Sequence, residues 1–143
     1  MKAMPRAILL VEDDANDALL VQRAFRKAKL ANPIRVVEDG EQAIDYLRRG
    51  DSRPPCLILL DLNMPKMNGI EFLKVVKADE NLRMIPVVVL TTSHEQRDIV
   101  ESFELGVAGY MVKSADYAEA AQIIRMIDKY WTLSETPGQV VMS

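Results

Sequence analysis

The alternation of short apolar runs with helix-like patterns constrains the fold of this chain more than any other feature. Five apolar runs are separated by segments in which apolar residues recur every three or four positions. The expected strands are 7–11, 34–37, 56–60, 87–90 and 110–112. A short continuous apolar run is typical of a strand buried on both faces. Five strand–helix units therefore predict an α/β fold, a doubly wound five-stranded parallel sheet with helices on both faces.

The expected helices follow the strands in turn. They cover about 17–28, 40–49, a segment around 70–76, a segment around 99–103, and about 115–131. Three helices are preceded by candidate capping boxes, at 39–42, 68–71 and 93–96, and His94 in the third is expected to begin its helix. Asp14 is expected to cap the first helix and Ser114 the last.

The length and the end of the chain predict one domain with a short tail. A chain of 143 residues suits a single domain with a sizeable core. Residues 1–131 form the expected domain. Residues 132–143 contain Pro137 and Gly138, lack clear periodicity and are expected to form a loosely ordered tail.

Composition and charge exclude several classes of protein. The 18 Lys and Arg against 21 Asp and Glu give a formal charge of −3, without the basic surface expected of a nucleic-acid or anionic-membrane binder. The first apolar run, 7–11, is too short for a signal peptide or a membrane span. A single cysteine, Cys56, excludes an internal disulfide. We therefore expect a cytoplasmic protein.

Polar residues that can carry chemistry follow four of the strands. Glu12 and Asp13 follow the first strand, Asp61 the third, Thr91 the fourth and Lys113 the fifth. Ligands of such sheets bind beyond the carboxyl ends of the strands. Carboxylates that converge there repel one another unless a cation lies between them, and oxygen ligands alone favour Mg²⁺. With a lysine and a hydroxyl aimed at an anion, the set predicts phosphoryl transfer to a carboxylate.

Four motifs in order carry a resemblance to a known family. They are Leu9–Asp13, Leu60–Pro65, Val89–Thr91 and Gly109–Lys113, each at a strand end. With them the sequence resembles the receiver domains of two-component response regulators over nearly all of residues 7–131. The resemblance implies the flavodoxin-like receiver fold, with strand order 2-1-3-4-5.

The resemblance also implies an acceptor and a metal site. Asp61 would accept a phosphoryl group from a histidine kinase. The Mg²⁺ ligands would be Asp13 directly, Glu12 mainly through water, Asp61, and the main-chain carbonyl of Asn63. The protein would then be a signalling switch and not a turnover enzyme.

Three further residues acquire roles from the resemblance. Thr91 and Lys113 would bind the phosphoryl group. Tyr110 would turn inward when Thr91 moves, as an aromatic switch residue. The signal would reach the face built from the fourth helix, the fifth strand and the last helix. A second apolar line on the last helix is compatible with a broad core contact, or with a partner or homodimer contact through that face.

Further motifs point to a subgroup. Leu60–Pro65, Leu90–Ser93 and Tyr130–Trp131 resemble single-domain regulators that partner bacterial and cyanobacterial phytochromes. A bacteriophytochrome kinase is the partner that this resemblance implies.

One position departs from the family pattern. The family usually has proline after the lysine, joined to it by a cis peptide, and here the residue is Ser114. A cis peptide before a residue other than proline costs about 2.5–4 kcal/mol. The backbone that presents Lys113 is therefore left open by the sequence.

Three other functions fit the sequence less well. An aspartyl-phosphate phosphatase of the haloacid dehalogenase type needs a second Asp two residues after the first, where this chain has Asn63. A flavodoxin-like binding module needs a phosphate-binding loop after the first strand, and the acidic run 12–14 would repel phosphate. A transcription factor would need a DNA-binding domain, for which no residues remain after Trp131.

Overall fold

The computed structural model describes residues 6–49, 53–64, 66–92 and 95–113. The predicted last helix, 115–131, and the predicted tail, 132–143, lie outside the described residues. So do Ser93, His94 and Ser114, and with Ser114 the question of a cis peptide after Lys113.

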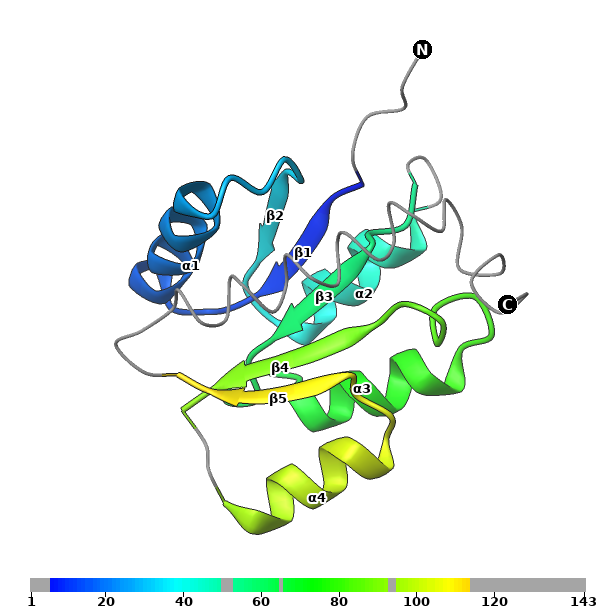
Figure 1. The fold of residues 1–143 in the computed structure, drawn as a ribbon. Coiled ribbons are helices and arrows are strands. Elements are labelled where there is room, and N and C mark those ends of the chain that lie inside the picture. The colour runs from blue at the N-terminus through cyan, green and yellow to red at the C-terminus, as the bar shows by residue number, and fades with distance from the viewer. Residues whose placement is uncertain (1–5, 50–52, 65, 93–94, 114–143) are drawn as a thin grey trace, which may run out of the picture.

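A five-stranded parallel sheet forms the centre of the domain (Figure 1). The strands are β1 (Ile8–Val11), β2 (Ile34–Val37), β3 (Leu57–Leu60), β4 (Val87–Thr91) and β5 (Gly109–Val112). Their order is β2-β1-β3-β4-β5, and all four neighbouring pairs are parallel. The predicted fold and strand order are confirmed, with each strand boundary within one residue of the predicted one.

Burial follows strand position. Every residue of β1, β3 and β4 is buried, whereas the edge strands β2 and β5 have none that is fully buried. The three central strands carry the most continuous apolar runs, as expected where both faces are covered. Glu12, Asp61 and Thr91 lie at the carboxyl ends of these central strands, and Lys113 follows the edge strand β5.

Helices cover both faces of the sheet (Figure 1). The described helices are α1 (Ala15–Lys27), α2 (Gly40–Arg48), α3 (Gly69–Ala78) and α4 (Gln96–Glu104). The core under α1 contains Val21 and Phe25, and the core on the other face contains Ile44 of α2 and Phe72 of α3. None of the described helices, of which α1 is the longest at 13 residues, could span a bilayer.

Three predicted helix starts are confirmed by capping bonds. Asp14 accepts hydrogen bonds from the amides of Asn16 and Asp17, at 2.8 and 3.0 Å. Asp39 accepts from the amide of Gln42 at 2.9 Å. The Asn68 box is complete, because the side chains of Asn68 and Glu71 each accept from the other's amide.

The predicted start of the fourth helix is wrong. A box at 93–96 would start that helix at residue 94, but α4 begins at Gln96, and Glu95 at its N-cap makes no side-chain capping bond. The backbone of Glu95 is still extended, with φ −69° and ψ 134°, so the helix cannot begin earlier. Phe103, one of the two apolar residues used to place this helix, is 51% exposed and not part of the core.

Candidate functional site

Three carboxylates meet where β1 and β3 end. Glu12 and Asp61 are buried, at 2% and 5% exposure, and Asp13 is exposed. The amide of Asp61 donates to the carbonyl of Val11 at 3.0 Å, so the two chain segments stay paired just beyond the strands. One carboxylate oxygen from each of the three acids lies within 4.8 Å of the other two. This cluster of hard oxygen ligands suits a divalent cation.

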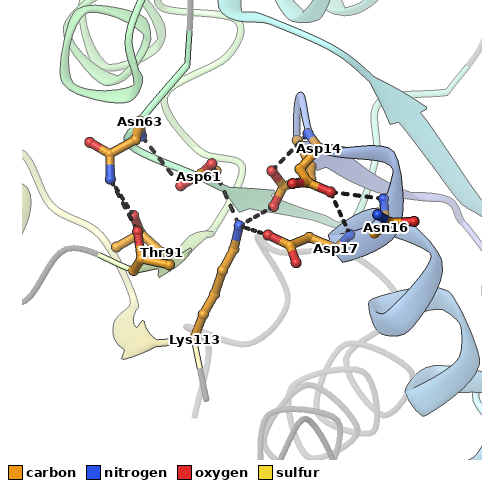
Figure 2. A network of polar contacts seen from close by, with 9 residues as sticks. Asp14, Asn16, Asp17, Asp61, Asn63, Thr91 and Lys113 are labelled. Carbon is orange, nitrogen blue, oxygen red and sulfur yellow. Dashed lines mark hydrogen bonds and ion pairs between the residues drawn. The ribbon is translucent and has the colours of Figure 1, made fainter. Parts of the chain in front are cut away.

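Lys113 reaches into this cluster from the end of β5 (Figure 2). Its amide donates to the carbonyl of Thr91 at 2.6 Å, which extends the pairing of β4 and β5. Its ammonium lies 2.5 Å from Glu12 Oε1, 2.8 Å from Asp17 Oδ2 and 3.6 Å from Asp61 Oδ2. The side chain is only 6% exposed, so a buried cation faces three carboxylates.

Burial and charge shift the ionisation of two groups. Burial, helped by the nearby Asp61 charge, raises the pKa of Glu12 to about 7 although the Lys113 ammonium lowers it. Burial alone would lower the pKa of Lys113. The hydrogen bonds from its ammonium to Asp17 and Glu12 outweigh burial and raise the pKa, so Lys113 stays charged.

Thr91 and Asn63 lie on the other side of Asp61 (Figure 2). Thr91 is fully buried at the end of β4. The Asn63 amide group donates to the hydroxyls of Thr91 at 3.5 Å and Thr92 at 3.4 Å, and the Asn63 backbone N–H donates to Asp61 Oδ1 at 3.3 Å. Hydroxyl and amide groups therefore surround the side of Asp61 that Lys113 does not occupy.

Tyr110 lies in β5, next to the strand that ends in Thr91. Its register partner in β4 is Val89, and Thr91 pairs with Val112, so Thr91 and Tyr110 lie on the same face of the sheet. Tyr110 is partly buried and packs against the core that α2 and α3 cover. The predicted switch pair is thus on neighbouring strands with side chains on one face.

The prediction from sequence missed Asp17. This residue lies in the first turn of α1 and follows no strand directly, so the strand-end rule did not select it. Its position after Asp14, the helix cap, was the available signal, because the first turn of α1 begins at the edge where the acids converge. The structure shows it as a direct partner of Lys113.

Gly69 was also missed, and it fixes the loop that carries Asp61. The amide of Gly69 donates to the carbonyl of Leu62 at 3.0 Å. A Cβ at Gly69 would lie 2.6 Å from the Leu62 Cα and 2.7 Å from the Asp61 carbonyl oxygen, closer than real Cβ atoms come. Glycine therefore lets the start of α3 close directly onto this loop.

A pocket of about 710 Å³ opens beside the acids. Asp13, Asn63 and Thr92 line it from the strand ends, and α3 and α4 contribute Ile70 and Arg97. The exposed Asp13 and Asn63 thus face open space, while Asp61 and Lys113 lie behind them. A donor molecule can approach the carboxylates from this side.

Known proteins share this sequence and fold. The family model of the response regulator receiver domain matches residues 8–125. Response regulator Rcp1 of Synechocystis is 39% identical over 131 residues, which cover 89% of each protein.

Solved structures agree. The phosphorylated cyanobacterial phytochrome response regulator RcpA is 41% identical with a TM-score of 0.77, covering 92% of this chain and 96% of its own. The Mn²⁺-bound form of Rcp1 is 39% identical with a TM-score of 0.76, covering 89% and 94%. With a matching family model, relatives and fold, this chain belongs to the response regulator receiver domain family.

Proposed function

We propose that Asp61 accepts a phosphoryl group from a histidine kinase. The observation that carries this proposal is the buried Asp61 carboxylate between the Lys113 ammonium, at 3.6 Å, and the acids Glu12 and Asp13. An Asp61 oxygen attacks phosphorus, and the phosphorus–nitrogen bond of the donor phosphohistidine breaks as the P–O bond forms. The imidazole leaves with the electron pair and takes up a proton.

The metal in this proposal is Mg²⁺. Glu12, Asp13, Asp61 and the main-chain carbonyl of Asn63 would hold it, and oxygen donors alone fit a hard ion. Bound there, Mg²⁺ would neutralise charge on the phosphoryl oxygens during transfer. That Rcp1 was solved in a Mn²⁺-bound form supports a divalent ion at the corresponding acids.

Lys113 and Thr91 complete the proposed phosphoryl site. The ammonium of Lys113 neutralises one phosphoryl oxygen, and the Thr91 hydroxyl donates to another. Both side chains are nearly or fully buried, which strengthens their electrostatic effect on the developing charge. Neither contact regenerates the acceptor, so the protein is proposed to act stoichiometrically as a switch and not as a turnover enzyme.

We propose that the conformational change on phosphorylation is transmitted from Thr91 to Tyr110. When Thr91 moves towards the phosphoryl group, it vacates space on the sheet face that it shares with Tyr110. Tyr110, which is only partly buried, then turns inward. This motion changes the surface of α4 and β5.

We propose a homodimer through α4, β5 and the predicted last helix, whose residues 115–131 are not described. Val100, Phe103 and Val112 are 43%, 51% and 45% exposed on this face, which we call the α4–β5 face. Sedimentation of the full chain with and without phosphorylation tests the dimer. Phe103→Glu should weaken self-association, and unchanged sedimentation would contradict the proposal.

The proposed kinase is a bacteriophytochrome. The similarity to RcpA, a cyanobacterial phytochrome response regulator, and to Rcp1 supports this choice. Phosphotransfer profiling against histidine kinases tests it. Transfer from a phytochrome kinase at a rate no greater than from unrelated kinases would contradict it.

The acceptor is tested by labelling the full chain with acetyl phosphate and Mg²⁺. Intact-mass analysis should show one added phosphoryl group, lost in Asp61→Asn and retained in the control Asp45→Asn, which changes an exposed acid on α2. EDTA should block the labelling. Undiminished labelling of Asp61→Asn, or labelling that proceeds equally in EDTA, would refute the assignment.

A further inference from the structure

Asp17 makes the closer of the two aspartate contacts to Lys113. The Lys113 ammonium lies 2.8 Å from Asp17 Oδ2 but 3.6 Å from Asp61 Oδ2. The first distance is that of a charge-assisted hydrogen bond, and the second is too long for one. In this state of the protein, the lysine is therefore held by Glu12 and by Asp17 of α1, and it makes no hydrogen bond to the acceptor. Figure 2 shows the Asp17 contact.

Asp17 is not one of the acids that could hold the metal ion. The acids whose oxygens converge to hold an ion are Glu12, Asp13 and Asp61, and Asp17 is not among them. The described polar contact of the Asp17 carboxylate is with Lys113 alone. Its 29% side-chain exposure contrasts with 2% for Glu12, so water can take over the carboxylate when the lysine leaves.

Both ends of the Asp17–Lys113 contact are held by the fold. The Asp14 side chain caps the amide of Asp17 and fixes the first turn of α1. The carbonyl of Thr91 accepts from the amide of Lys113 and fixes the end of β5. Between these two fixed backbones, only the Lys113 side chain has to move for its ammonium to exchange acceptors.

We propose that Asp17 is a positioning residue that competes with the phosphoryl group on Asp61 for the Lys113 ammonium. This inference rests on the proposed function of Asp61. Before phosphorylation, Asp17 and Glu12 together hold the lysine out of hydrogen-bonding distance of Asp61. The phosphoryl group adds negative charge at Asp61 and draws the ammonium across, and the Asp17 carboxylate passes to water. Asp17 thereby opposes the phosphorylated state, both by retaining the lysine and by its own negative charge.

The test uses beryllium fluoride with Mg²⁺ as a phosphoryl mimic on the full chain. Asp17→Asn keeps an acceptor but removes the charge, and it should bind the mimic about fivefold more tightly than wild type, about 1 kcal/mol. Asp17→Glu restores the charge and should return the affinity towards wild type. The matched control is Glu41→Gln, which removes an exposed acid from the first turn of α2 and should leave the affinity unchanged.

A double-mutant cycle separates this role from a merely structural one. In a Lys113→Gln background, Asp17→Asn should have a clearly smaller effect than in wild type, because the ammonium for which Asp17 competes is absent and only the charge of Asp17 itself still acts. The ¹⁵N signal of the Lys113 ammonium should shift on adding the mimic to wild type, and in Asp17→Asn it should already lie displaced from the wild-type position without the mimic.

The outcomes distinguish this inference from the proposed function. If wild type does not bind the mimic, or Asp61→Asn binds it equally well, the function proposed for Asp61 fails. If wild type binds normally and Asp17→Asn binds with unchanged or weaker affinity, the role of Asp17 alone fails. An equal effect of Asp17→Asn with and without Lys113 overturns the competition as well.

Discussion

Helices α3 and α4 lie side by side but are held to the domain very differently. α3 begins with a complete capping box and buries Phe72, Leu73 and Val76. α4 has no side-chain capping bond, and its one buried residue is Ser102, whose hydroxyl has no partner among the described residues. Phe103 on α4 is half exposed. The helix next to the acceptor loop is thus held by a capping box and several buried side chains, and the helix beside β5 has neither.

This difference between α3 and α4 fits the proposed roles of the two regions, one that holds the acceptor and one that changes on phosphorylation. The carboxylates and the acceptor loop need a constant geometry, and α1 and α3 provide it through caps and buried side chains. The surface proposed to change lies over α4 and β5, and since α4 buries only Ser102 and has no side-chain cap, we expect less free energy to hold this helix in place. The following tests, from the largest expected effect to the smallest, compare the two regions.

A matched pair of phenylalanines gives the largest contrast. Phe72→Ala removes a side chain of zero exposure from the core under α3, and should lower the free energy of unfolding by about 3–5 kcal/mol. Phe103→Ala removes a half-exposed ring from α4 and should cost less than about 1 kcal/mol. Urea denaturation measures both. Similar losses for the two variants would show that α4 is held as firmly as α3.

The burial of Glu12 should make the free energy of unfolding depend on pH. Burial raises the Glu12 pKa from 4.5 to about 7, so its ionisation is less favourable in the folded protein than in the unfolded chain. The metal-free protein should therefore keep this stability below about pH 4.5 and lose up to about 3 kcal/mol as pH rises through 7. The measurement is the difference in unfolding free energy between wild type and Glu12→Gln, in EDTA, from pH 4.5 to 8. A difference that stays constant over this range would contradict the shift.

Two glycines provide the next comparison. At Gly69 a Cβ would lie 2.6 Å from the Leu62 Cα, and Gly69→Ala should cost about 2 kcal/mol and slow labelling of Asp61. At Gly109 in β5 the nearest atoms would be Val88 methyls at 3.8 Å, an ordinary contact. Gly109→Ala should change stability by less than about 0.5 kcal/mol. Thermal unfolding of both variants checks this, and a tolerated Gly69→Ala would mean that α3 can move off the loop.

Helix caps give the smallest effect. Asp14→Ala removes two capping bonds from α1 and should cost about 1 kcal/mol. Glu95→Asp places a short acceptor at the N-cap of α4, where Glu95 makes no capping bond, and should gain a few tenths of a kcal/mol. Denaturation midpoints of the two variants, compared with wild type, measure both changes in stability. A loss of stability in Glu95→Asp would show that Glu95 already serves α4 in another way.

The sequence predicted the sheet, and the meeting of polar strand-end residues at one edge, because both follow from local rules. Buried parallel strands read as unbroken apolar runs, and polar residues directly after them must share one edge. Asp17 and Gly69 escaped because their roles depend on which side chains and backbones meet across the fold. The start of α4 was wrong because the polar pattern at 93–96 fits a capping box, while the backbone of Glu95 is still extended.

The contact between Lys113 and Asp17 also bears on the order of folding. It joins residues 96 positions apart, from the first helix to the end of β5. Glu12 and Asp61 come together once β1 pairs with β3, but the lysine arrives only when β5 has docked on β4. Contacts between such distant residues are generally made late in folding. We therefore expect the chain to form its acidic pocket before it gains the cation that balances it, so that the proposed phosphoryl site is complete only when β5 has joined the sheet.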